Sequence, residues 1–180
     1  MNRAEYEKLL EEKFREAYEV AAEARRRIGS PTPEVEVFLA KDLAERVELL
    51  VGPRGVAEKI RRYFGKRPQE KLAFKLAEEL VRELKGRMEE DRLILQVIRT
   101  CLAVLTPPCI TAAPTEGVVD AKVKHNLDGS RYLAIYFAGP IRSAGTTAGA
   151  FVLVIIDYLR NKFGYAKYDI TEEEIKRVIT

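Results

Sequence analysis

The chain has 180 residues, of which 47% are hydrophobic and 33% are charged, with a net charge of +3. This composition is typical of a globular protein and excludes an intrinsically disordered one. The two cysteines, Cys101 and Cys109, are too few for a disulfide scaffold, and no apolar run reaches the about 20 residues that cross a bilayer. We therefore expect a cytoplasmic protein with no membrane partner.

The N-terminal part has the spacing of helices. Apolar residues recur at helical intervals from residue 2 to residue 28, and Gly29-Ser30-Pro31 ends this pattern. Four further helices are expected over residues 41–51, 56–64, 69–85 and 89–105. Pro107 and Pro108 end the last of them, because proline lacks the backbone N–H that a helix needs. Residues 1–108 are therefore predicted to form a helical bundle with short connections.

The densest group of basic residues lies on the third of these helices and the turns beside it: Arg54, Lys59, Arg61, Arg62, Lys66 and Arg67. Basic residues at this density neutralise phosphates in proteins that bind nucleic acid. The same pattern also occurs on solvated helix faces, where long basic side chains cover apolar surface. The sequence leaves both interpretations open.

The period of the pattern changes after residue 108. Two alternating runs, around residues 119–125 and 132–138, flank an Asp-Gly turn and predict a β-hairpin. Lys122, Lys124, Tyr132 and Tyr136 are expected on one face of it. Aromatic and basic side chains interleaved on a sheet stack and neutralise single-stranded nucleic acid, and a half-solvated face with cross-strand pairs is the alternative.

A helix over residues 151–163 completes a β-β-α order, which is typical of α+β units that bind single-stranded nucleic acid. A second unit is therefore expected over residues 115–180, with a boundary in the proline-containing segment between residues 109 and 117. A capping box at Thr171–Glu174 opens a last helix. That helix has no C-terminal signal before Thr180, so we expect the chain to be cut from a longer one.

A small-residue corner joins the hairpin to its helix. Gly139, Pro140 and Gly145 are expected to form a structural turn, and Arg142 and Ser143 lie inside it. Thr146 and Thr147 follow at the expected helix start, where backbone N–H groups lack internal partners and bind anions. The guanidinium and hydroxyl groups suit a phosphate, although a tight strand-to-helix turn with a solvated arginine has the same pattern.

The segment from Leu127 to Ala148 resembles the amino-terminal region of the large subunit of archaeal family D DNA polymerase. Its core, Gly139-Pro-Ile-Arg-Ser-Ala-Gly145, is a distinctive heptapeptide of that family. Supporting matches are Leu39-Ala-Lys-Asp-Leu-Ala-Glu-Arg-Val47 and Tyr168-Asp-Ile-Thr-Glu-Glu-Glu-Ile175, so the resemblance covers most of the chain. One departure is Thr146, which stands where the family usually has a second glycine and which puts the detail of the turn in question.

The resemblance implies a KH-like domain in the second unit and a place in a replicative polymerase. It also implies two partners: DNA, and a small subunit that carries a 3′–5′ exonuclease. The helical bundle would serve assembly, including self-association. The catalytic aspartates of the family, with their divalent metal such as Mg²⁺, and its zinc-binding cysteines lie downstream of the matched region, so the resemblance implies no catalytic residue and no cofactor or metal in this segment.

The residues themselves point the same way. Nucleotide addition needs carboxylates that hold divalent metal ions, and we find no convincing carboxylate pair; Asp128 is better explained as the residue of the hairpin turn. We therefore predict a polymerase segment that is inactive alone and contacts DNA through Arg142, Ser143, Thr146, Thr147, Lys122 and Lys124. The alternatives are a structural interaction or dimerisation module without nucleic-acid contact, and a small phosphate-ligand enzyme that uses Ser143.

Overall fold

The computed structural model describes residues 1–32, 40–107, 110–142 and 147–179. They fall into two units, Met1–Leu39 and Ala40–Thr180. Within the described residues, no helix combines the length and the apolar character that crossing a membrane requires.

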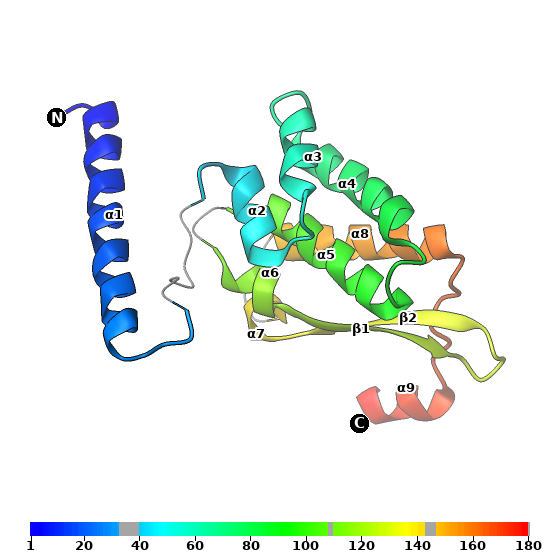
Figure 1. The fold of residues 1–180 in the computed structure, drawn as a ribbon. Helices are drawn as coiled ribbons and strands as arrows, with labels where there is room; N and C mark the ends of the chain where they lie inside the picture. The colour runs from blue at the N-terminus through cyan, green and yellow to red at the C-terminus, as the bar shows by residue number, and fades with distance from the viewer. Residues whose placement is uncertain (33–39, 108–109, 143–146, 180) are drawn as a thin grey trace. The chain divides into compact units, whose positions relative to one another are not determined.

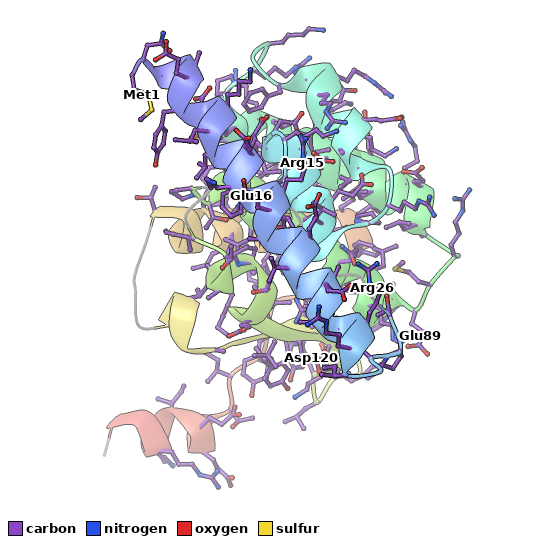
Figure 2. All side chains as sticks on the ribbon, turned by 60° about the vertical axis from the view of Figure 1, so that its left-hand side comes forward. Met1, Arg15, Glu16, Arg26, Glu89 and Asp120 are labelled. Carbon is purple, nitrogen blue, oxygen red and sulfur yellow. The ribbon has the colours of Figure 1, made fainter. Side chains whose placement is uncertain are left out.

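Among its described residues, the first unit has one long helix, α1, Arg3–Arg27. Asn2 and Glu5 form a capping box, in which the Glu5 N–H donates to Asn2 Oδ1 and the Asn2 N–H donates to Glu5 Oε2, both at 2.9 Å. At the other end Gly29 takes a φ of +71°, which is easiest for glycine, and Ser30 N–H donates to Arg25 O. Side chains project along its whole length from Met1 to Arg26 (Figure 2).

The second unit begins with four helices at nearly the predicted places: α2 at Leu43–Val51, α3 at Val56–Tyr63, α4 at Gln69–Leu84 and α5 at Glu90–Leu105. Asp42 links the first two. Its carboxylate accepts from the Glu45 N–H at 2.7 Å, which caps α2, and from the Arg61 guanidinium of α3 at 2.7 and 3.2 Å. These hydrogen bonds fix where α2 starts and how α3 returns beside it.

Helix α5 runs through the middle of the second unit (Figure 1). Nine of its residues are buried: Leu93, Ile94, Val97, Ile98, Thr100, Cys101, Leu102, Ala103 and Val104. They cover too wide an arc for one neighbour, so α2, α4, the hairpin and a later helix all pack against it. Burial of this apolar surface is the main driving force for folding this unit.

The predicted hairpin is confirmed, with β1 at Val118–His125 and β2 at Arg131–Phe137 in an antiparallel pair. The Asp128 carboxylate accepts from the Ser130 N–H at 2.8 Å, and Gly129 takes a φ of +83°. This is the role expected for Asp128, because aspartate before glycine stabilises such turns. The Ser130 side chain and N–H lower the pKa of that carboxyl.

The β-β-α order continues with α8, Thr147–Phe163, and the chain ends in α9, Glu172–Ile179. The expected boundary between residues 108 and 115 lies inside the second unit, where the chain does not divide. The reason is a shared core: Val118 and Ala121 of β1 and Ile155 of α8 are fully buried in the same cluster as α4 and α5. A two-stranded hairpin buries too little surface to form a core by itself.

Two short helices that the sequence did not predict flank the hairpin: α6, Ala112–Glu116, and α7, Gly139–Arg142. They meet at Gly117, whose carbonyl accepts from the Ala138 N–H at 3.0 Å. A Cβ at Gly117 would lie 2.4 Å from Ala113 O and 2.7 Å from Ile141 Cγ1. Only glycine lets the backbone and Ile141 approach this closely, so this position holds the two helices together.

Replacing Gly117 with alanine tests this contact. The added methyl group would meet a backbone oxygen, so we expect Gly117→Ala to lower the free energy of unfolding by about 1–3 kcal/mol in urea titrations. Gly139→Ala is the matched control, because no described atom lies within 4 Å of a Cβ there and its φ is not positive. Equal effects of the two substitutions would contradict the close-packing role of Gly117.

Asp42 predicts a pH dependence. Arg61 and the Glu45 N–H hold the pKa of Asp42 below its ordinary value. Its contribution to stability is therefore complete above about pH 4, the ordinary pKa, and is lost as the pH falls through the lower folded pKa. We expect Asp42→Ala to cost about 1 kcal/mol at neutral pH.

Urea titrations at neutral and acidic pH measure this difference. The cost should shrink near pH 2, because the carboxyl of the unaltered protein is then protonated. Glu70→Ala, which removes an exposed carboxylate in the first turn of α4, serves as control. A cost for Asp42→Ala that stayed constant with pH would show that the charge of Asp42 contributes nothing.

Candidate nucleic-acid interface

The corner between hairpin and helix is where the sequence placed it. β2 ends at Phe137, α7 follows, and α8 starts at Thr147, which is exposed. Arg142 is the last residue of α7, and its side chain lies outside the described part, as do the whole residues Ser143 and Thr146. Ile141 of α7 fixes the described part of the corner, because it packs against the core and against Gly117.

The three residues expected to make the turn have different places. Gly139 opens α7 with an ordinary backbone conformation, so the described geometry there does not require glycine. Pro140 is the next residue of this helix, a position in the first turn where proline is tolerated because its missing N–H would have no partner. Gly145 lies outside the described residues. The described part of the corner is therefore a short helix, and residues 143–146 lie outside the described residues.

The hairpin face has the predicted composition. In the register, Lys124 lies opposite Tyr132, Lys122 opposite Ala134, and Tyr136 opposite Asp120, so the four predicted residues share one face. The Lys124 ammonium lies 5.2 Å from the centre of the Tyr136 ring. The Tyr136 hydroxyl raises the pKa of Lys124. Lys124 is thus an exposed cation beside an aromatic ring.

Lys122 has a different environment. Its Nζ lies 3.3 Å from Asp120 Oδ2 and 3.9 Å from Asp91 Oδ2. Asp91, in the first turn of α5, also accepts from the Val123 N–H at 2.9 Å, and so binds the free edge of β1. Lys122 therefore helps to fix the hairpin on α5, and two carboxylates offset its charge where a phosphate would approach.

The two tyrosines also differ. The Tyr132 ring packs against Tyr168, with ring centres 4.8 Å apart, and Tyr132 is half-buried. The Tyr168 hydroxyl donates to the Glu174 carboxylate, which raises the pKa of that tyrosine to about 12. Tyr136 is 42% exposed. The open part of this face is therefore the Tyr136 ring with the Lys124 ammonium beside it. The sequence pattern gave no sign that Tyr168 would cover Tyr132, which lies opposite Lys124 in the register.

The basic group around α3 is partly neutralised. Lys59 lies 2.9 Å from Glu83, Arg61 pairs with Asp42, and the Arg67 guanidinium lies 5.9 Å from the centre of the Tyr63 ring. The sequence showed six cations together but could not show the partners in the two ion pairs, which lie 24 residues from Lys59 and 19 residues from Arg61. This surface is therefore less positive than its composition suggests.

Two buried polar residues, which the sequence pattern did not single out, hold segments of the second unit together. Arg46 of α2 donates to the carbonyls of Ala103, Pro107 and Ile110, and so holds the C-terminal end of α5 and the segment after it. Asn126 donates to Lys167 O and accepts from the Asp169 N–H, which binds the segment after α8 to the hairpin. Asn126 also donates to Ser130 Oγ at 2.9 Å within the hairpin turn. The other contacts named here join residues more than 40 positions apart, so no local motif predicts them.

Of the two cysteines, Cys101 lies within the described residues. Cys101 is fully buried, its Sγ donates to Ala73 O, and burial raises the pKa of the thiol to about 12. Cys109 lies outside the described residues. Within the described ranges, no group of three or more His, Cys, Asp or Glu side chains is placed to hold a metal ion.

Known proteins are similar to this chain over most of its length. Residues 5–180 match the family described as DNA polymerase II large subunit DP2, N-terminal. The large subunit of DNA polymerase II from Methanothermobacter thermautotrophicus is 45% identical over 173 residues, covering 94% of this chain and 16% of the relative. The subunit from Pyrococcus furiosus is 40% identical over 178 residues, covering 97% of this chain and 14% of the relative.

The match reaches almost every element described above, from α1 to α9, and it includes the corner and the hairpin. The chain spans only a small part of the length of these relatives. The family model itself is that of the N-terminal region. The chain therefore belongs to the family of N-terminal regions of the archaeal DNA polymerase II large subunit.

Proposed function

We propose that this chain acts as the N-terminal part of a replicative DNA polymerase large subunit, in the cytoplasm, where it supplies assembly surface and DNA-backbone contacts and no catalytic carboxylate. The main support for this proposal is the family match over residues 5–180, together with relatives that are 40–45% identical and are named DNA polymerase II large subunit. The whole enzyme performs DNA-directed DNA synthesis, and a small subunit with 3′–5′ exonuclease activity is its partner.

The magnesium and zinc of such an enzyme are assigned to other parts of the longer protein. The described residues offer no group of ligands that fits either ion. Divalent ions in a polymerase hold the phosphates of the incoming nucleotide, and this requires clustered carboxylates.

DNA contact on the hairpin is assigned to Lys124 and Tyr136. Lys124 has an aromatic neighbour and no carboxylate partner among the described residues, whereas Lys122 lies between two carboxylates. An ammonium that is already paired gains little from a phosphate, because it has to give up one partner for another. The corner adds Arg142, Ser143, Thr146 and Thr147, at the junction that α7 and Gly117 hold in place.

A second candidate, a protein-interaction or dimerisation module without DNA contact, is supported by α1. No residue of this helix is buried, and Tyr6, Leu9, Leu10 and Phe14 are 41–52% exposed. An apolar stripe on a long helix binds another protein surface in many assemblies. Both functions are compatible in one segment, so the experiments separate DNA contact from assembly.

Arg142 provides the first test. We expect the 180-residue chain to bind fluorescein-labelled primer–template DNA at low salt. Arg142→Ala should reduce the slope of log affinity against log salt by about 1, as the loss of one phosphate contact requires. Arg15→Ala, an exposed arginine of α1, is the control for the change in charge.

Fluorescence anisotropy over a salt series measures both slopes. Equal binding by the unaltered chain and Arg142→Ala at every salt concentration would remove Arg142 from the interface. Failure of the unaltered chain to bind DNA, combined with capture of the small subunit, would favour the interaction module.

The hairpin provides the second test. We expect Lys124→Gln to weaken binding to single-stranded DNA and to lower the salt slope by about 0.7, and Lys122→Gln to change either quantity much less. Each is the control for the other, since the charge change and the strand are the same. A larger effect for Lys122→Gln would show that its ion pairs open when DNA binds.

A further inference from the structure

A small basic hollow lies between the C-terminal ends of α4 and α8, away from the predicted corner. It has a volume of about 270 Å³ and is lined by Glu78, Val81, Arg82, Lys85, Lys162 and Phe163. Glu78, Val81 and Arg82 are spaced i, i+3 and i+4 on one face of α4, and Lys85 is the residue that caps the C-terminal end of that helix. Lys162 and Phe163 come from the last turn of α8. Three of the six lining residues are cations.

The three cations have no carboxylate within ion-pair distance among the described residues. The Lys85 ammonium lies 5.8 Å from the centre of the Phe163 ring, and Lys162 Nζ lies 3.3 Å from the Tyr158 hydroxyl. Arg82 is exposed, with five N–H donors. This contrasts with Lys122, Arg61 and Lys59, which the fold pairs with aspartate or glutamate.

The only carboxylate in the lining is already engaged. Glu78 Oε2 lies 2.8 Å from Lys75 Nζ. Lys75 lowers the pKa of Glu78, and the charges of Lys162 and Arg82 act in the same direction, which shows that the positive field of the hollow reaches it. The lining therefore keeps a net positive charge, because three cations face the single carboxylate of Glu78, which Lys75 also engages.

Helix dipoles do not explain why the three cations line the same hollow. Cations in a last turn complement the dipole of their own helix by about 0.3–1 kcal/mol. That interaction is available on any side of the helix, yet Arg82, Lys85 and Lys162 line the same hollow and repel one another there. Because the helix ends present carbonyl oxygens, attraction for an anion has to come from these side chains alone.

We propose that this hollow binds phosphate groups of a DNA backbone. Exposed arginine and lysine side chains around an open hollow suit a chain of phosphates that passes across them, and Val81 and Phe163 form an apolar wall suited to sugar and base edges. This inference rests on the proposed function, which supplies DNA as the polyanion. It places a backbone contact on α4 and α8, in addition to the hairpin and the corner.

The first experiment removes two of the cations. We expect Arg82→Gln with Lys85→Gln to lower the salt slope for a single-stranded oligonucleotide by about 1.4, two contacts' worth, between about 50 and about 200 mM NaCl. The control is Arg15→Gln with Lys71→Gln, two exposed cations of α1 and the start of α4. A loss in the control as large as in the hollow variant, or no loss in the hollow variant, overturns the inference.

The second experiment gives a gain that unfolding cannot mimic. We expect Glu78→Gln to strengthen oligonucleotide binding and to raise the salt slope, because it removes the one carboxylate of the lining and frees Lys75. Glu83→Gln is the matched control: it changes the same charge on the same helix and frees Lys59, outside the hollow. Unchanged or weaker binding by Glu78→Gln, or an equal gain by Glu83→Gln, overturns the inference.

The outcomes also separate this inference from the proposed function. Binding by the unaltered chain that neither the paired Arg82 and Lys85 substitutions nor Glu78→Gln alters refutes the hollow and leaves DNA contact elsewhere intact. Failure of the unaltered chain to bind any oligonucleotide at about 50 mM NaCl refutes both. Thermal unfolding of each variant checks that the fold is retained.

Discussion

The second unit depends on the burial of α5. Its apolar residues cover so much of its circumference that no single neighbour can remove them from water. Helices α2, α4 and α8 and the hairpin each take one side of it. Removing any one of these neighbours would expose part of α5 to water, so elements far apart in the sequence form one cooperative core.

The polar residues of α5 have a second role, which is to fix what surrounds it. Thr100 Oγ1 lies 2.8 Å from Gly52 O and Gln96 Nε2 lies 2.6 Å from Val51 O, so the turn after α2 is bound. Asp91 and Arg99 reach the free edge of β1, at Val123 N and Val118 O. An edge strand left open invites pairing with another chain. Here the helix that the strand covers also closes that edge.

Because this edge is closed, only part of the hairpin surface is available to a ligand. Its inner face is committed to α5, its edge to Asp91 and Arg99, and one end of its outer face to Tyr168. What remains is the region of Lys124 and Tyr136, together with the corner that Gly117 and Ile141 support. Ion pairs also determine where the rest of the surface is positive. The net charge of the chain is only +3, so the local charge at any site depends on which cations the fold leaves without a carboxylate partner.

Local chemistry determined much of this protein. Apolar spacing predicted α1 to α5 to within two residues at their starts, the Asp-Gly turn predicted the hairpin and the shared face of Lys122, Lys124, Tyr132 and Tyr136, and the Gly139–Gly145 heptapeptide carried the family. These signals are short-range: a helix period, a turn and a motif are each complete within a few residues. The hydroxyl groups of Ser143 and Thr146 stay predictions, because they lie outside the described residues.

Only the tertiary structure decided how the chain divides and which charges are available. The sequence expected two units that meet between residues 108 and 115, but α5, the hairpin and α8 share one core, and the division lies at Leu39 instead. Lys122 and Lys124 are alike in sequence, yet Asp91, 31 residues before Lys122, pairs with one of them. Such contacts join residues far apart in the chain, and their strength depends on distances and burial that no local pattern records.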